Sequence, residues 1–359
     1  MHSVILLWMT DFLGNAYPHL AEKLRKTSFA SLPTPVSSHE IDTSAGNRVI
    51  SIKHDDQTSA LYGGNKIRKL EYIFRRATDR GARRVATFGT VGSNHALATA
   101  VFAKHLGLEC TCFLAHQKRT PNIPKTLNMH LKLGTEMVRY GGSVDQLKLF
   151  RRYLQHRHTW VIPLGGSCWF GAVGFVNAGL ELAAQVKAGE ISLPDRIYIA
   201  NGTMGSVAGL ALGLALAELP TKLHAVRVAD NRYTHPGALE QLMRKTVVLL
   251  NRLDASIPLD LMQRTRLQWR DDFFAGGYAQ VDDATQNAVA FAHDQLGLAL
   301  ETTYTGKAMA AMLHDLSTDD QASGRYLFWN THNSRPLPVA SATPTSPQDM
   351  PAEFMRYFD

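Results

Sequence analysis

The sequence predicts an α/β protein in which mainly parallel sheets are covered by helices and the chain forms two domains. Segments with a buried-strand pattern alternate with segments whose apolar residues recur at helical spacing, the order expected of strand–helix–strand units. The chain has 359 residues, and at roughly 150 residues per domain this suggests about two domains. With 45% hydrophobic and 19% charged residues, the composition is globular and excludes a wholly disordered or fibrous chain.

The first half of the chain shows the alternation most clearly. After a turn at Gly63 and Gly64, Ile67, Leu70 and their successors recur at helical spacing, and Asn65 is placed to cap this helix. The expected elements are a strand at 49–53, a helix at 65–74, a strand at 84–89, a helix at 94–105, a strand at 109–115, a helix at 125–133 and a strand at 137–140.

The second half repeats this order. A strand is expected at 196–200, then a helix at 207–218 composed almost entirely of Ala, Leu and Gly, then a strand at 223–228. No internal repeat and no low-complexity linker separates the two halves. We therefore expect two α/β lobes between which the chain crosses.

Net charge, cysteine content and the lack of several known motifs limit the classes of function that the sequence allows. The 38 basic and 31 acidic residues leave +7, which an anionic small-molecule ligand explains at least as well as nucleic acid. Cys110 and Cys112 alternate within one strand and are expected to be buried, reduced thiols. No metal-binding pattern, hydrolase nucleophile elbow or membrane-length apolar run occurs. Apolar residues 4–9 lack the features of a signal peptide, so a cytoplasmic protein is expected.

The strongest candidate binding element is a glycine-rich turn between the strand at 196–200 and the following helix. Backbone amides freed by glycine, a hydroxyl at the helix start and the positive end of the helix dipole together favour an anion such as phosphate. A tight connection without a ligand is the alternative. The turn consists of Gly202, Thr203, Met204, Gly205 and Ser206.

A second turn, at 89–95, has the same position between a strand and a helix. Ser93 and Asn94 fall at the helix N-terminus, where capping alone explains either residue. Alternatively, the helix start presents these polar groups to a ligand or to a substrate carboxylate. His95 is expected to pack beside them.

Lys66 is the third candidate element. It stands in the first turn of its helix, where a positive charge opposes the helix dipole, so the pKa of the amine should be lowered. A neutral amine is the form that attacks a carbonyl carbon. On this argument alone, an ordinary exposed lysine is an equal alternative.

Together these motifs resemble the pyridoxal-phosphate-dependent enzymes of the tryptophan synthase β-like fold type II. More narrowly, they resemble the group containing 1-aminocyclopropane-1-carboxylate deaminase and D-cysteine desulfhydrase. The most specific match is Gly-Gly-Asn-Lys-x-Arg-Lys-Leu-Glu at 63–71, and the resemblance extends from residue 28 to 334. Further matches lie at 32–35, 92–96, 165–167, 171–178 and 304–309.

The resemblance implies a two-lobed fold of open, three-layer sheets with the cofactor between the lobes. The larger, cofactor-binding domain would comprise residues 1–67 and 181–359, and the smaller, inserted domain residues 68–180. Lys66 would bind pyridoxal 5'-phosphate covalently and then act as general base, while Asn94 would contact the 3′-oxygen of the cofactor. Ser93 would lie beside the substrate, and residues 202–206 would hold the phosphate. A homodimer is implied as well.

The resemblance also indicates the reaction. Thr305 would face the pyridine nitrogen, where the deaminase pattern has glutamate and the desulfhydrase pattern has threonine; His95 also matches the desulfhydrase pattern. A neutral hydroxyl makes the ring a weaker electron sink, which disfavours opening a cyclopropane ring. Tyr278 and Tyr304 match two substrate-side tyrosines, although buried aromatic residues need no function.

Three departures from the family pattern should change which substrate the site accepts, while the cofactor chemistry should be kept. Gly92 replaces the glutamine that usually precedes Ser-Asn. Cys168-Trp169 replaces Asn-Pro after Gly-Gly-Ser, and at 331–336 a glycine pair has become Asn333-Ser334, which should reshape one wall of the site.

The expected function is therefore that of a lyase acting on a small amino acid, possibly of D configuration. Its reaction would be α,β-elimination to a 2-oxo acid and ammonia, as in D-cysteine desulfhydrase. The alternatives are ring-opening deamination of 1-aminocyclopropane-1-carboxylate, a hydrolase-type reaction, and a non-catalytic relative that binds an amino acid. No nucleic acid, membrane or metal is expected as a partner.

Overall fold

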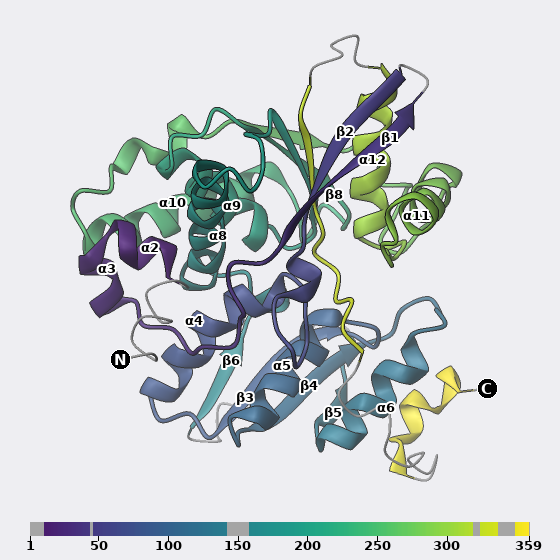
Figure 1. Ribbon diagram of the computed structural model, residues 1–359. Coiled ribbons are helices and arrows are strands. Elements are labelled where there is room, and N and C mark those ends of the chain that lie inside the picture. Colours follow the sequence, from purple (N-terminus) through teal and green to yellow (C-terminus); the bar gives the residue numbers. More distant parts are fainter. Residues whose placement is uncertain (1–10, 44–45, 142–157, 319–323, 337–348, 359) are drawn as a thin grey trace. The chain divides into compact units, whose positions relative to one another are not determined.

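A computed structural model describes residues 11–43, 46–141, 158–318, 324–336 and 349–358 (Figure 1). The apolar segment 4–9 lies outside these residues. The chain divides into two compact units, which are described separately. Unit 1 comprises Met1–Tyr72 and Ser167–Ser334, and unit 2 comprises Ile73–Gly166 and Arg335–Asp359.

Unit 1 is built on a six-stranded sheet with the strand order β1-β2-β10-β7-β8-β9. Only the β1–β2 pair is antiparallel, and the other neighbours are parallel. The strands are β1 (Val36–Thr43), β2 (Gly46–Lys53), β7 (Arg196–Asn201), β8 (Lys222–Arg227), β9 (Leu267–Arg270) and β10 (Tyr326–Trp329).

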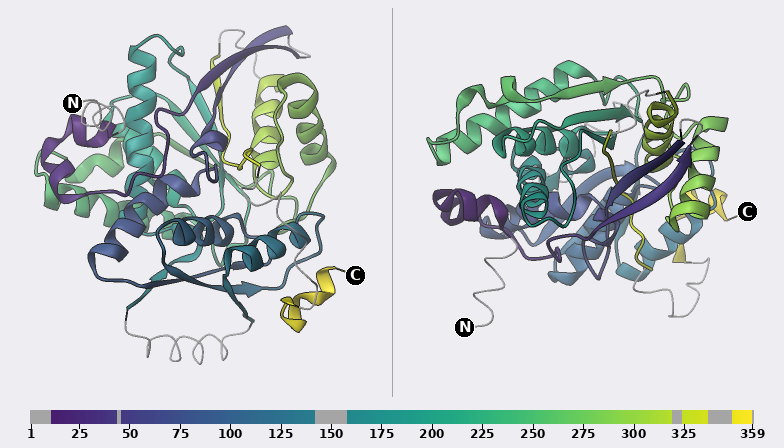
Figure 2. Two further views of the ribbon diagram at one scale, coloured as in Figure 1. Left: turned by 60° about the horizontal axis from the view of Figure 1, so that its bottom comes forward. Right: turned by 45° about the horizontal axis from the view of Figure 1, so that its top comes forward.

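Helices cover both faces of this sheet, which makes unit 1 a three-layer α/β structure (Figures 1 and 2). Alternation along β7 explains the layers, because Ile197 and Ile199 pack on one face and Tyr198 and Ala200 on the other. The first face carries α8 (Trp169–Lys187), α9 (Gly205–Leu216) and α10 (Pro236–Leu253). The second face carries α11 (Asp283–Leu296) and α12 (Thr305–Thr318). The remaining helical elements are α2 (Phe12–Ala16), α3 (Pro18–Lys23), η1 (Asp55–Gln57) and η3 (Leu259–Arg264).

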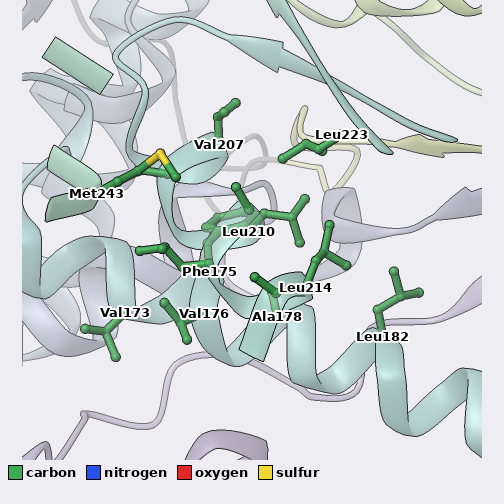
Figure 3. Packing of buried hydrophobic residues seen from close by; sticks show 14 of the residues in the cluster. Val173, Phe175, Val176, Ala178, Leu182, Val207, Leu210, Leu214, Leu223 and Met243 are labelled. Carbon is green, nitrogen blue, oxygen red and sulfur yellow. The ribbon is translucent and has the colours of Figure 1, made fainter. Parts of the chain in front are cut away.

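The core of the first face lies mainly between α8 and α9 (Figure 3). Both helices are apolar around most of their circumference, which is expected of helices buried on several sides. This packing fixes the start of α9, where the turn 202–206 ends. Figure 3 shows Val173, Phe175, Val176, Ala178 and Leu182 of α8 beside Val207, Leu210 and Leu214 of α9.

Unit 2 contains a fully parallel four-stranded sheet with the order β5-β4-β3-β6. Cys110 and Cys112 lie buried in β4 as free thiols, as predicted from their alternation. The elements are β3 (Arg84–Thr90), α5 (Asn94–His105), β4 (Glu109–Ala115), α6 (Ile123–Leu133), β5 (Glu136–Arg139), β6 (Thr159–Ile162), η2 (Leu164–Gly166) and η5 (Ala352–Tyr357). Helix α4 (Lys66–Asp79) begins in unit 1 and continues into unit 2.

The division between the units differs from the predicted boundaries. Residues 68–72 and 167–180 group with unit 1, whereas 335–359 group with unit 2 rather than with the larger domain. The physical reason for the second difference is that Phe354 is fully buried and that the Tyr357 hydroxyl bonds the chain at residue 117. Among the described helices, none combines the length and hydropathy that crossing a membrane requires.

Candidate active site

Lys66 is the first residue of α4 and belongs to unit 1. Its amine donates to Asn65 Oδ1 at 2.7 Å, and Asn65 Nδ2 donates to Ser206 Oγ at 2.9 Å. Asn65 was expected to cap α4, but its side chain instead links the lysine to the turn 202–206. Two hydrogen bonds therefore connect two elements that are 140 residues apart in the sequence.

A buried ion cluster holds α4 in place two residues after Lys66. The guanidinium of Arg68 makes two bonds to Asp55, at 2.9 and 2.7 Å, and its Nη1 donates to Glu181 Oε2 at 2.8 Å. Lys53 Nζ donates to the other oxygen of Glu181 at 2.6 Å. All four side chains are essentially inaccessible to solvent. The cluster ties α4 to β2, η1 and α8.

The turn at 202–206 has the geometry of an anion site. Met204 adopts a left-handed conformation with φ 66°, which is uncommon for a residue other than glycine. Ser167 Oγ lies 2.7 Å from Thr203 Oγ1 and accepts from the Gly205 amide at 3.1 Å. A Cβ on Gly205 would lie 2.6 Å from Ser167 Oγ, so this position requires glycine. The amides of the first turn of α9 have no partners within the helix.

Thr305 is buried at the start of α12 and is held by Glu301. Glu301 Oε1 accepts from the Thr305 amide at 2.8 Å and lies 3.2 Å from Thr305 Oγ1. The Glu301 amide donates to the same hydroxyl at 3.1 Å. A carboxylate therefore stands directly behind the neutral hydroxyl, an arrangement that was not predicted from the sequence.

Tyr304 and Tyr278 form a pair whose hydroxyl oxygens are 2.6 Å apart. The Tyr304 ring packs against the turn 202–206, since a Cβ on Gly202 would lie 3.4 Å from Tyr304 Cε1. Burial and the neighbouring Tyr278 raise the pKa of Tyr304 well above 10. Lys307 fixes the loop that carries Tyr278, because its fully buried amine donates to the carbonyls of residues 274 and 277 at 2.6 and 3.2 Å.

The environment of Lys66 makes the neutral form of its amine more accessible than in an ordinary lysine. Burial lowers the pKa of the amine to about 8, and the negative charge of Glu301 opposes this change only in part. The direction agrees with the prediction made from the helix position. The cause differs, because desolvation is the largest effect here.

The altered segment 331–334 supports the turn that precedes Lys66. The Thr331 carbonyl accepts from the Asn65 amide at 3.1 Å, and Asn333 Oδ1 accepts from the Gly63 amide at 2.7 Å. Ser334 Oγ donates to Asp56 Oδ2 at 2.6 Å. The polar residues that replace a glycine pair therefore bind the chain next to the lysine.

Ser93 and Asn94 belong to unit 2, so their position beside Lys66 stays a prediction. Ser93 caps α5, because its Oγ accepts from the Ala96 amide at 3.2 Å. His95 is buried below the turn, with Nε2 2.9 Å from Thr87 Oγ1. Capping does not consume the hydroxyl hydrogen of Ser93, which can still be donated.

The donor set in unit 1 fits a cofactor with a carbonyl group and a phosphate. An amine of lowered pKa can serve as the nucleophile, and a glycine-rich turn at a helix N-terminus, which suits an anion, lies two hydrogen bonds away. The buried Thr305 hydroxyl and the tyrosine pair provide further polar groups for a ring and its substrate. Among the described residues, no group of His, Cys, Asp and Glu is arranged to hold a metal ion.

Fold and site together define a pyridoxal-phosphate-dependent enzyme. The chain belongs to this family, whose model, described as pyridoxal-phosphate dependent enzyme, matches residues 27–331. The cofactor predicted from the sequence is thereby confirmed, as is the α/β fold with parallel sheets.

Among characterised relatives, the chain is similar to D-cysteine desulfhydrase of Salmonella typhimurium (strain LT2). The two are 31% identical over 308 residues, which covers 83% of this chain and 90% of the relative. A solved structure described as an ACC deaminase homologue is 26% identical, with a TM-score of 0.73 and coverage of 87% and 93% of the two chains. A solved fungal L-serine ammonia-lyase, from Rhizomucor miehei, is 18% identical with a TM-score of 0.55, covers 83% and 95%, and shares the fold alone.

Two residues around the site were not predicted from the sequence, and a third, Asn333, was predicted only to reshape one wall of the site. These are the carboxylate behind Thr305, the amine that fixes the Tyr278 loop, and the amide that holds Gly63. The amine and the amide act on segments 30 and 270 positions away, so no local pattern indicates them. The carboxylate lies one helical turn before Thr305, where an acidic residue gave a readable signal. The three residues are Glu301, Lys307 and Asn333.

Proposed function

We propose that the protein catalyses α,β-elimination from a small amino acid with a β-leaving group, with D-cysteine as the best candidate. The Cα–H and Cβ–S bonds break, hydrogen sulfide leaves, and one water converts the remaining unsaturated amino acid into a 2-oxo acid and ammonia. The observation that carries the proposal is a neutral hydroxyl, that of Thr305, at the start of α12 in a site built around Lys66. The similarity to D-cysteine desulfhydrase over 308 residues supports it.

In the proposed elimination, each residue of the site has its own role. Pyridoxal phosphate, when bound, supplies an electron sink. Lys66 binds it and then removes the α-proton, for which an amine with a pKa of about 8 is suited near neutral pH. Residues 202–206 bind the phosphate, and Asn94 orients the ring. Ser93 and the Tyr278–Tyr304 pair bind the substrate and move protons beside it.

Thr305 favours elimination over ring opening. Its hydroxyl is neutral, and the carboxylate behind it already accepts the amides of Tyr304 and Thr305 at 2.9 and 2.8 Å. The negative charge of Glu301 is thus shared among helix donors instead of being directed at a ring nitrogen. Loss of an α-proton and a good leaving group needs a weaker electron sink than opening a cyclopropane ring. Ring-opening deamination stays the second candidate because of the solved ACC deaminase homologue.

Two measurements test the proposal. Borohydride should fix the cofactor to the amine that binds it, and peptide mapping should find it on Lys66. Lys69, which is buried and lies about one helical turn further along α4, is the internal control. The holoenzyme should then release sulfide and pyruvate from D-cysteine faster than it releases ammonia from 1-aminocyclopropane-1-carboxylate. The opposite preference would exclude elimination as the main activity, and bound cofactor without turnover of any D- or L-amino acid would indicate a non-catalytic relative.

The assembly and location are also proposals. A homodimer in the cytoplasm is supported by the family resemblance and by free, buried thiols at Cys110 and Cys112, which suit a reducing compartment. The inserted-domain arrangement, with the cofactor between two lobes, is supported in the same way by the resemblance.

A further inference from the structure

The side chain of Gln117 occupies the space beside Gly92. A Cβ on Gly92 would lie 3.0 Å from Gln117 Nε2 and 3.4 Å from Gln117 Oε1, closer than side chains normally approach. The backbone of Gly92 has no positive φ, so its conformation does not demand glycine. A side chain at position 92 would instead meet the side-chain amide of Gln117. Position 92 is also where the family pattern usually carries glutamine, directly before Ser93 and Asn94.

This contact lies at the carboxyl ends of two adjacent parallel strands. Thr90 of β3 pairs with Ala115 of β4, and the Ala115 carbonyl accepts from the Val91 amide at 3.0 Å. Ligands of open α/β sheets bind beyond the carboxyl ends of the strands. Two polar atoms at this edge are buried and have no partner among the described residues, Thr90 Oγ1 and Gln117 Oε1. Buried polar atoms normally take a hydrogen-bond partner, so both atoms are available to bind a ligand.

The C-terminal segment fixes Gln117. The Tyr357 hydroxyl accepts from the backbone N–H of Gln117 at 3.2 Å and lies 3.1 Å from the backbone carbonyl oxygen of the same residue. It also lies 3.0 Å from His116 Nδ1. Tyr357 is itself anchored, because it is 2% exposed and Phe354 in the same short helix is fully buried. The helix η5 follows residue 331, where the match to the family model ends.

We propose that Gln117 is a specificity-determining residue that supplies, from the end of β4, the side-chain amide that family members carry at position 92. This amide binds the amino-acid substrate next to Ser93, and Tyr357 is a positioning residue for it. A carboxamide offers a donor and an acceptor, which match the carboxylate and ammonium groups of an amino acid. The inference rests on the proposed function in that its ligand is an amino acid.

The test uses the holoenzyme of full length and two readouts. D-alanine has no β-leaving group, so a titration of the cofactor absorbance with D-alanine measures binding without elimination. Steady-state kinetics with D-cysteine measures KM and kcat separately. If the wild type binds D-alanine but releases no sulfide from D-cysteine, the proposed reaction is wrong. The role of Gln117 in binding can then still be measured with D-alanine.

Removing and relocating the amide give opposite expectations. Gln117→Ala and the isosteric Gln117→Glu should each raise the Kd for D-alanine and the KM for D-cysteine about tenfold, because a hydrogen bond to a charged group is lost. The kcat should change less than KM. Gly92→Gln alone should weaken binding by displacing Gln117, whereas Gly92→Gln combined with Gln117→Gly should restore Kd to within about threefold of wild type.

Further variants separate contact from positioning. Tyr357→Phe should raise Kd about threefold in the wild type and should have no effect in the Gln117→Ala background, since both act through one group. The exposed neighbour change Lys118→Ala should leave both readouts unchanged. Unchanged Kd and KM in Gln117→Ala would overturn the proposal. The proposal would also be overturned if the Gly92→Gln, Gln117→Gly double variant had wild-type thermal stability but did not restore binding.

Discussion

Replacing Arg68 by methionine should destabilise the protein strongly. The substitution keeps an unbranched apolar stem but leaves Asp55 and Glu181 buried with one cation, Lys53, between them. Removing one partner from a buried ion cluster costs about 3–5 kcal/mol, a large part of a typical total of about 5–15 kcal/mol. At roughly 2–4 °C per kcal/mol for a domain of this size, the melting temperature should fall by roughly 6–20 °C.

The assay is urea and thermal unfolding of the full chain, with Arg75→Met as the matched control. Arg75 lies on the same helix and pairs with Asp79, but both side chains are about a third exposed, so its loss should cost at most about 1 kcal/mol. Equal effects of the two substitutions would refute the reasoning.

The pH dependence gives a second check on the same cluster. Arg68 and Lys53 hold the pKa of Glu181 well below its ordinary value of 4.5. A depressed carboxyl pKa stabilises the folded state fully above the unfolded value and loses this contribution as the pH falls below it. Wild-type stability should therefore decrease as pH falls below about 4.5, and the slope should be shallower in Arg68→Met.

Two predictions concern the cofactor site. The rate at which pyridoxal phosphate adds to the apoprotein should rise with pH and reach half its plateau near 8, because neutral Lys66 is the reactive form; a midpoint near 10.5 would contradict the buried environment. Gly205→Ala should weaken cofactor binding at least about tenfold, measured by absorbance titration, because the new methyl group meets Ser167 Oγ at 2.6 Å. Gly141→Ala, at an exposed glycine with open space around it and no positive φ, is the control. Similar cofactor affinity in both variants would argue against the turn.

Local patterns predicted the elements that carry strong periodicity. The helix at 94–105 and the strand at 109–115 have the bounds of α5 and β4 because an alanine-rich helix and a buried apolar strand lie between glycine turns. Strand β10 was missed although it lies in the middle of the six-stranded sheet. It consists of four apolar residues, Tyr326–Trp329, which are too few for a period, and its pairing with β2 and β7 depends on segments far away in the chain.

In the site, too, local features were predicted and contacts between distant segments were not. Motif spacing indicated Lys66 and the turn 202–206, which are local features of strand–turn–helix connections. The role of Asn65 could not be predicted in this way, because its partner Ser206 lies 141 positions further along the chain. A side chain that can cap a helix takes a tertiary partner when one is available, and propensity contains no information about that partner.

The protonation state of the thiols in β4 matters in an enzyme whose proposed product is hydrogen sulfide. Cys110 and Cys112 lie in the same strand that ends near Gln117, with their sulfur atoms 3.8 Å apart. Burial raises the pKa of Cys112 well above 9, so this thiol stays protonated at neutral pH. Thiolates, not thiols, undergo exchange and oxidation. Cys112 is thus kept from reacting as a thiolate with oxidised forms of the sulfide that the proposed reaction would release.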